Sequence, residues 1–198
     1  MRSGLRKWLP VFLISPLIAS VAVAGEQGAL SQEEIQQQLA GFYFAAARAG
    51  DNAVLHEFID AGFDLETADE KGYTALILAA YNGRGDTVRL LLDAGANACT
   101  EDKRGNTALL GAIFKGELGI ARQLMKADCD LNQPNLAGQT PAMFAALFQR
   151  LELLDELARQ GADLDVVDRM GNSAANLAEG RFATGQAGGE SRSSSALR

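Results

Sequence analysis

Apolar residues in this chain recur at helical spacing and return with a period of 33 residues. Val88, Leu91 and Leu92 fall on one face of a helix, because residues three or four positions apart lie on the same side. The same pattern recurs at Ala121, Leu124 and Met125, and again at Leu151, Leu154 and Leu157. A first helix of about eight residues, ended by a glycine, is expected before the second helix of a pair. The pattern predicts an all-α fold of repeated helix pairs.

Other residues repeat with the same period and mark turns, caps and close contacts. Four series carry this repeat: Gly72, Gly105, Gly138 and Gly171; Thr74, Thr107, Thr140 and Ser173; Ala46, Ala79, Ala112 and Ala145; and Gly62, Gly95 and Gly161. The first glycines suit turns that need a positive φ, and the hydroxyl residues two positions later are good helix N-caps. Since one helix pair cannot bury its own apolar face, we expect the units to stack around one continuous core.

Two motifs within this repeat resemble those of the ankyrin-repeat family. The segment 73–80, Tyr-Thr-Ala-Leu-Ile-Leu-Ala-Ala, is similar to the signature Thr-Pro-Leu-His-x-Ala-Ala, and 90–97 is similar to the close Leu-Leu-x-x-Gly-Ala-Asp. The resemblance covers about residues 41–180 and implies a solenoid of helix–turn–helix pairs with β-turn or hairpin connections. The implied units are about 41–68, 69–101, 102–134 and 135–167, with a partial fifth at 168–180.

The chain departs from the family pattern at positions that affect packing. No unit keeps the signature His, and Thr140-Pro141 alone keeps the Pro. The resemblance therefore implies weaker hydrogen bonding between units than the family normally has. Gly85 stands where an apolar residue is usual and Asp128 replaces a glycine, so we expect looser packing near both.

The first 24 residues have the composition of an export signal. Three basic residues precede an apolar run that ends in Ala22-Val23-Ala24, which places small residues before a cut after Ala24. We expect residues 1–24 to be a signal peptide and the mature protein to be periplasmic. An uncleaved membrane anchor is the alternative.

The two ends of the repeat region are expected to differ from its middle. Residues 25–40 are expected to form an N-terminal capping region, in which Ser31 and Glu34 predict a capping box. This box opens a polar helix over residues 32–39 that can cover the first unit. Residues 181–198 are rich in Gly, Ser and Ala, so we expect a disordered tail.

Charge restricts the class of partner. Removing residues 1–24 takes away three positive charges and changes the formal net charge from −7 to −10 (−7 − 3). A chain this acidic repels phosphate backbones and anionic lipid surfaces. A basic protein surface is the partner that this acidic field would attract. We expect a monomer that binds another protein, with no nucleic-acid partner and no membrane contact after signal cleavage.

Candidate catalytic, cofactor and metal residues are few. His56 is the one histidine and falls in a solvent-facing slot, and the chain offers no convincing nucleophile–base pair. We therefore expect neither an enzyme nor a bound cofactor. Asp163, Asp165 and Asp168 are interpreted as turn carboxylates rather than calcium ligands.

The two cysteines belong to adjacent units. Cys99 and Cys129 are 30 residues apart, which places them three positions out of register in units spaced about 10 Å apart. A disulfide needs Cα atoms within about 7 Å. We therefore expect unpaired thiols, although an oxidising periplasm would allow them to pair.

The resemblance implies that a partner binds the concave face, which is made of turn tips and the exposed sides of the first helices. The expected protein-binding residues are Tyr73, Tyr81, Asn82, Lys103, Arg104, Asn106, Phe114, Lys115, Leu147, Phe148 and Arg169. Neighbouring positions on this face are Lys71, Leu136, Gln139 and Met170. Large aromatic residues at solvent-facing positions are typical of binding hot spots. The alternative is that Phe114 and Phe148 pack between helices.

Three hypotheses on function follow. The first is a periplasmic module that holds, protects or positions a partner protein. Similar exported bacterial ankyrin proteins are associated with oxidative-stress defence and catalase function, and an immunity protein against a secreted toxin is the related alternative. The second is a small hydrolase within a repeat scaffold. The third is a haem or metal carrier that uses His56 and the two cysteines.

Overall fold

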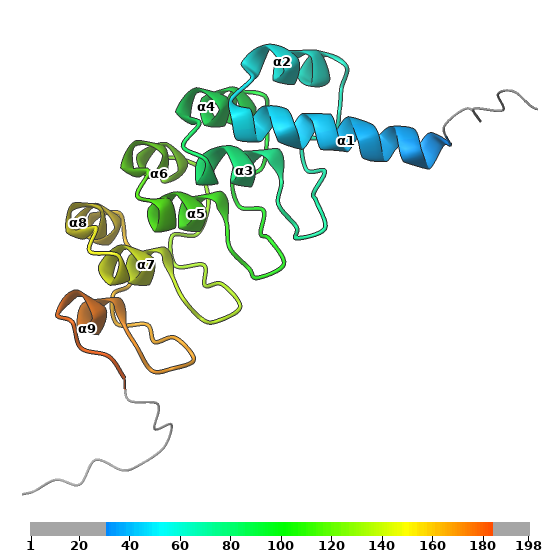
Figure 1. The fold of residues 1–198 in the computed structure, drawn as a ribbon. Coiled ribbons are helices and arrows are strands. Elements are labelled where there is room, and N and C mark those ends of the chain that lie inside the picture. Colours follow the sequence, from blue (N-terminus) through cyan, green and yellow to red (C-terminus); the bar gives the residue numbers. More distant parts are fainter. Residues whose placement is uncertain (1–30, 184–198) are drawn as a thin grey trace, which may run out of the picture.

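The computed structural model describes residues 31–183, which form a stack of helix pairs with turns projecting on one side (Figure 1). The helices within this range are α1 (Gln32–Ala49), α2 (Asn52–Asp60), α3 (Ala75–Tyr81), α4 (Gly85–Asp93), α5 (Ala108–Lys115), α6 (Leu118–Leu124), α7 (Pro141–Leu147), α8 (Leu151–Arg159) and α9 (Ala174–Ala178). The odd-numbered helices form one layer and the even-numbered helices form the second. The predicted all-α solenoid with a partial fifth unit is confirmed.

The repeated hydroxyl residues set where the first helices begin. The Oγ1 atoms of Thr74, Thr107 and Thr140 each accept a hydrogen bond from the backbone N–H three residues later. Ser173 does the same at α9. Each such cap stabilises a helix by about 1 kcal/mol, so the predicted N-caps contribute at every unit from the second onward.

The turns before these caps touch the turns of the next unit. The backbone N–H of Lys103 donates to the Lys71 carbonyl oxygen at 2.9 Å, and that of Leu136 donates to the Arg104 carbonyl oxygen at 2.9 Å. Arg169 repeats this bond to Ala137 at 3.1 Å. Successive units are therefore joined by backbone hydrogen bonds that do not depend on the missing signature His. Isolated bridges from Ala68 to Thr74 and from Val167 to Ser173 close two of the hairpins.

Small and apolar side chains fill one continuous core between the two layers. The repeated alanines, Ala46, Ala79, Ala112 and Ala145, are all buried, which allows the first helices to lie close together. Leu91, Leu124 and Leu157 from the second helices pack against the same core. Burial of each leucine side chain stabilises the folded state by about 1.5–3 kcal/mol, so the stacked units stabilise one another.

Helix α1 differs from the predicted capping helix. The Ser31–Glu34 capping box is present, but the helix runs without a break through the expected boundary at residue 40 and into the first unit. Residues 31–39 are exposed, so they extend away from the stack and do not cover it (Figure 1). Phe42 is 65% exposed, whereas Ala75 and Ala108 in the same repeat position are buried. The reason is that no earlier unit lies against α1 within the described residues.

Residues 181–183, which follow α9, are held by hydrogen bonds and an ion pair. The Ala183 N–H donates to the Asn172 side-chain oxygen at 2.8 Å, and Arg181 forms an ion pair with Glu179. Residues 181–183 therefore belong to the folded part. The remainder of the expected tail, 184–198, lies outside the described residues, as do residues 1–24 of the expected signal peptide.

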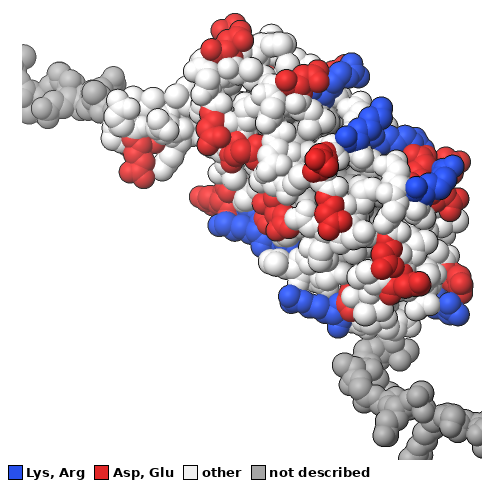
Figure 2. All heavy atoms as spheres, turned by 180° about the vertical axis from the view of Figure 1, so that it is seen from behind, with Lys and Arg blue, Asp and Glu red and all other residues white. Residues whose placement is uncertain are grey.

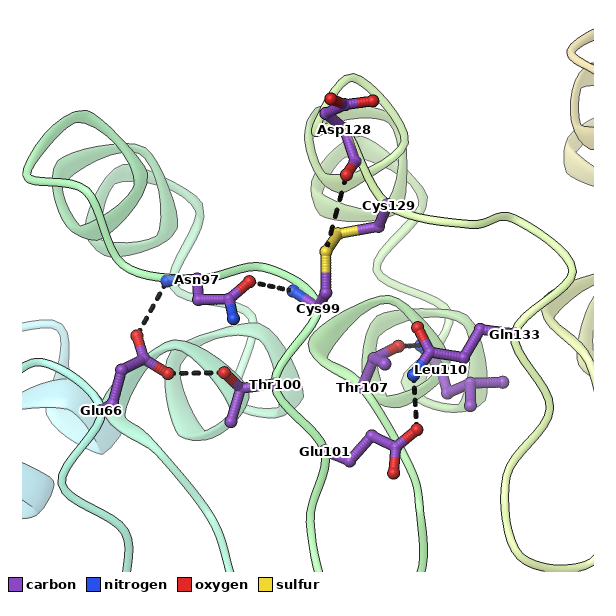
Figure 3. The surroundings of a disulfide bond; sticks show 10 residues. All are labelled: Glu66, Asn97, Cys99, Thr100, Glu101, Thr107, Leu110, Asp128, Cys129 and Gln133. Carbon is purple, nitrogen blue, oxygen red and sulfur yellow. Dashed lines mark hydrogen bonds between the residues drawn. A yellow bond between two sulfur atoms is a disulfide. The ribbon is translucent and has the colours of Figure 1, made fainter.

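The expectation of unpaired cysteines is wrong. Cys99 and Cys129 form a disulfide, with their Cα atoms 5.6 Å apart (Figure 3). The spacing of the helix axes does not give the distance between the two cysteines, because the segments that follow the second helices approach one another more closely than the helices do. In the same region of the stack, Glu66 accepts hydrogen bonds from the Asn97 backbone N–H and the Thr100 hydroxyl.

The residue at position 128 changes the path of the chain beside the disulfide. Gly62, Gly95 and Gly161 have positive φ after the second helices, but Asp128 does not. Helix α6 accordingly ends at Leu124, two residues earlier in the repeat than α4 ends at Asp93. Because α6 ends early, Cys129 lies beyond the end of the helix, where it is bonded to Cys99. The departure from the glycine pattern thus appears as a shorter helix with a covalent link beside it.

Replacing Gly105 by Ala tests the packing of turn against turn. Gly105 has φ +77°, and a Cβ there would lie 2.8 Å from the backbone N of Leu136. Gly95 has φ +94° with no atom within 4 Å of an added Cβ, so it is the matched control. We expect Gly95→Ala to lower the free energy of unfolding by about 1–2 kcal/mol, from φ alone. Gly105→Ala should cost more, as measured by urea denaturation; equal costs would contradict the close approach.

Removing the disulfide should destabilise the stack. The bridge closes a loop of 30 residues in sequence, so the double variant Cys99→Ser/Cys129→Ser should lose about 2–4 kcal/mol of unfolding free energy. Thermal unfolding followed by circular dichroism measures this loss. A reducing agent should lower the Tm of the wild type and leave that of the variant unchanged. An unchanged wild-type Tm on reduction would show that the bridge does not contribute.

Candidate functional site

A groove of about 660 Å³ lies between the first helices and the projecting turns. Its helix wall comes from α3, α5 and α7, and its turn wall comes from the turns before α5, α7 and α9. In Figure 1 these turns project beyond the first helices along one side of the stack. The groove therefore occupies the concave side on which the resemblance placed a partner.

Aromatic residues form a continuous row at the helix wall. The rings of Tyr81 and Phe114 are stacked with centroids 6.0 Å apart, and Phe114 meets Phe148 edge to face at 5.1 Å. Tyr81 is 42% exposed and Phe114 is 43% exposed, whereas Phe148 is half-buried. The aromatic residues thus pack on one another and still present ring surface to solvent. The ammonium group of Lys115 lies 4.9 Å from the Tyr81 ring centre.

Buried carboxylates hold the turn wall in shape. The Asp102 carboxylate accepts hydrogen bonds from the backbone N–H groups of Arg104 and Asn106 at 2.7 and 2.8 Å. Asp168 accepts the equivalent bonds from Met170 and Asn172. These two acids are therefore occupied inside their turns. The same turns leave the side chains of Lys103, Arg104 and Arg169 exposed at the tips.

An amide pair connects two of these turns. The Asn135 side-chain amide donates to the Asn106 side-chain oxygen at 3.0 Å, which joins the third and fourth units. Asn135 takes the place of Asp102 in its own turn, where its side-chain oxygen accepts from the backbone N–H groups of Ala137 and Gln139. The turn wall is therefore preorganised by hydrogen bonds both within and between units.

Most of the expected binding residues come together in this groove. Seven of them line it: Tyr73, Tyr81, Lys103, Arg104, Asn106, Phe114 and Arg169. The other four, Asn82, Lys115, Leu147 and Phe148, lie at the C-terminal ends of the first helices and outside the lining. Leu136, Gln139 and Met170 also line the groove.

Sequence reasoning missed the apolar floor of the groove. Ile77, Leu110 and Phe144 line it but were not among the expected binding residues. A signal was present, because each lies four positions before one of the aromatic residues and residues four apart share a helix face. They were overlooked because they also resemble ordinary core positions; Ile77 and Leu110 are indeed buried.

The basic side chains at the turn tips of the groove form no ion pairs in the described residues. Within residues 31–183 the ion pairs involve Arg48, Arg89, Arg122 and Arg181, and neither Lys103, Arg104 nor Arg169 is among them. Seen from behind, both basic and acidic side chains project along the edge where the turns end, at the left in Figure 2. An acidic protein thus carries exposed cations beside an aromatic groove.

The residues considered for a cofactor or metal lie apart from the groove. His56 is exposed on α2, and both cysteines are bonded in the disulfide, so a carrier has no thiol ligand from them. The side-chain oxygens of Asp163 and Asp168 accept backbone N–H groups in their turns. Across the part of the chain that is described, no group of three His, Cys, Asp or Glu residues is placed to hold a metal ion.

An ion pair with several hydrogen bonds joins two second helices, away from the groove. Arg122 on α6 binds Glu156 on α8 through two nitrogen atoms, the shortest contact being 2.7 Å. The guanidinium of Arg122 lowers the pKa of Glu156 from its ordinary value, chiefly by hydrogen bonding. Both side chains remain partly exposed, so the pair contributes modestly to stability.

Comparisons with known proteins agree with this architecture. No helix in residues 31–183 is both long and apolar enough to cross a membrane. No curated protein matches the chain. The family model for ankyrin repeats, in three copies, matches residues 42–135, which contain α2–α6 and the C-terminal part of α1. With the 33-residue period, the Thr caps and the stacked helix pairs in place, residues 42–135 belong to the ankyrin-repeat family.

Proposed function

We propose that this chain is a periplasmic, non-enzymatic module that holds a partner protein in the groove between its first helices and its turns. Ankyrin repeats indicate a protein–protein interaction module, which supports the general part of this proposal. The partner's identity and the compartment are proposals. Support of catalase in oxidative-stress defence is one version, and inhibition of a secreted toxin is the other.

The observation that carries the proposal is the half-exposed aromatic row. Tyr81 and Phe114 leave a large part of their rings in solvent, although they stack on each other. Burial of aromatic surface at a partner's surface gains about 25 cal/mol per Å² of apolar area. Rigid aromatic rings in a preformed groove lose little entropy on binding, so they are well suited as anchors for another protein.

Two features support export to the periplasm. The first 24 residues have the composition of a signal peptide, and the cysteines are placed for a disulfide. Disulfides persist in oxidising compartments and are rare in the cytosol, where thiols are kept reduced. A periplasmic protein would meet either a resident enzyme or an incoming toxin.

Truncation of the aromatic row should abolish binding. Tyr81→Ala/Phe114→Ala should lose capture of partners from a periplasmic extract, with the captured proteins identified by mass spectrometry. Both side chains are partly exposed, so helical circular dichroism should stay unchanged. Phe42→Ala is the matched control, because Phe42 is an exposed aromatic residue on α1 outside the groove.

The outcome of this capture experiment also separates the versions of the proposal. Recovery of a catalase supports the oxidative-stress version, and recovery of a toxin supports the immunity version. Capture that persists in Tyr81→Ala/Phe114→Ala but fails in Phe42→Ala would place the binding surface on α1 and contradict the groove.

Export predicts a defined start of the mature protein. The intact mass of the protein purified from periplasm should correspond to a chain that begins at Gly25, because the small residues at 22 and 24 direct cleavage after Ala24. Ala24→Arg should block cleavage and leave the longer chain attached to membranes. Recovery of the full chain from the cytosolic fraction would contradict the proposal.

A further inference from the structure

We propose that the groove takes an extended, acidic segment of its partner, with carboxylates at the turn wall and apolar side chains at the helix wall. This inference rests on the proposed function and adds the chemistry of the partner. It follows from the different chemistry of the two walls and from the positions of the Lys and Arg side chains at the turn tips, which form no ion pairs in the described residues.

The two walls differ in a way that suits a strand with alternating side chains. The helix wall offers Tyr81 and Phe114 beside the apolar floor, and the turn wall offers Lys103, Asn106 and Arg169. In an extended segment, successive side chains point to opposite sides. A segment lying along the groove would therefore direct every second residue to the aromatic row and the others to the cations.

The repeat sets the spacing of the carboxylates. Lys103, Leu136 and Arg169 occupy the same turn position in three successive units, and all three are exposed. Adjacent units lie about 10 Å apart, so the two cations are separated by about 20 Å. An extended chain rises about 3.3 Å per residue, which places the two matching carboxylates about six residues apart. Leu136, 58% exposed, lies between them and favours an uncharged centre.

Charge complementarity favours an anionic occupant over other candidates. Lys103 and Arg169 form no ion pair within residues 31–183, and Asp102 and Asp168 are buried in hydrogen bonds to their own turns. The acid Glu70 is exposed at the turn tip one unit before Lys103, but the exposed residues Lys71, Lys103, Arg104 and Arg169 leave an excess of positive charge along the tips. A second copy of this chain has a net negative charge, but its own groove carries the same basic side chains, which would repel those of the first copy. The chain's own residues 184–198 contain one acid and two bases, so their net charge has the wrong sign.

The probe is a fluorescein-labelled peptide Glu-Leu-Thr-Phe-Thr-Leu-Glu, whose two acids are six residues apart and whose apolar residues share one side. Fluorescence anisotropy should show that it binds the oxidised wild-type protein, with affinity that falls as salt is raised. The peptide Lys-Leu-Thr-Phe-Thr-Leu-Lys should bind at least about tenfold more weakly, because its charges meet Lys103 and Arg169.

Charge reversal of the protein gives the matched test. Lys103→Glu/Arg169→Glu should lose binding of the acidic peptide by about tenfold or more and gain binding of the basic one. Lys126→Glu/Arg159→Glu makes the same change in net charge at exposed residues outside the groove and should leave binding unchanged. Circular dichroism and Tm establish that both variants are folded.

Three outcomes of the peptide-binding and sedimentation experiments would overturn the inference. They are equal binding of the two peptides, absence of binding of the acidic peptide to the wild type, and sedimentation showing a wild-type dimer that Lys103→Glu/Arg169→Glu dissociates. The last result would make a second copy the occupant.

Capture of the native partner separates this inference from the proposed function. If Tyr81→Ala/Phe114→Ala abolishes capture while charge reversal leaves capture intact, the inference of an acidic segment is wrong and the proposed function stands. If neither variant affects capture, both proposals are wrong.

Discussion

The whole molecule depends on the burial of apolar surface between consecutive helix pairs. A single pair of helices this short has one face that it cannot bury alone, so each unit becomes stable by lying against the next. The repeated alanines set the distance at which this happens, because their small side chains allow the first helices to come close. Larger residues in these positions would separate the helices and open the core along the stack.

The same close stacking creates the groove. When the first helices lie close together, the turns that lead into them are also brought into contact, and each turn donates a backbone hydrogen bond to the previous one. The glycine at each tip is required where the next turn approaches, since a Cβ at Gly72 would lie 2.7 Å from the backbone N of Lys103. The binding surface is thus a consequence of stability. Its turn wall is held by bonds that also join the units.

Two turns that lack the usual glycine differ in whether tertiary packing overrides residue preference. Gln149 stands where other units have a glycine and still adopts a left-handed φ of 55°, because the chain must turn there from α7 into α8. Its side-chain amide donates to the Ala146 carbonyl oxygen at 3.2 Å, which partly offsets the backbone strain. Asp128 does not adopt the left-handed conformation of its glycine counterparts, and α6 is shorter as a result. The same loss of a glycine therefore had opposite outcomes at two turns.

The sequence by itself determined the period, the helix pairs, the caps and the side of the stack that carries the exposed aromatic residues. These follow from local chemistry that repeats every 33 residues, so each is specified several times over. The tertiary structure alone decided the disulfide, the continuous helix α1 and the apolar floor of the groove. The Cys99–Cys129 bridge depends on how two loops of adjacent units approach, and α1 extends because no unit lies against its first half in the described range. Such features depend on distances between segments, which a one-dimensional pattern of residues does not contain.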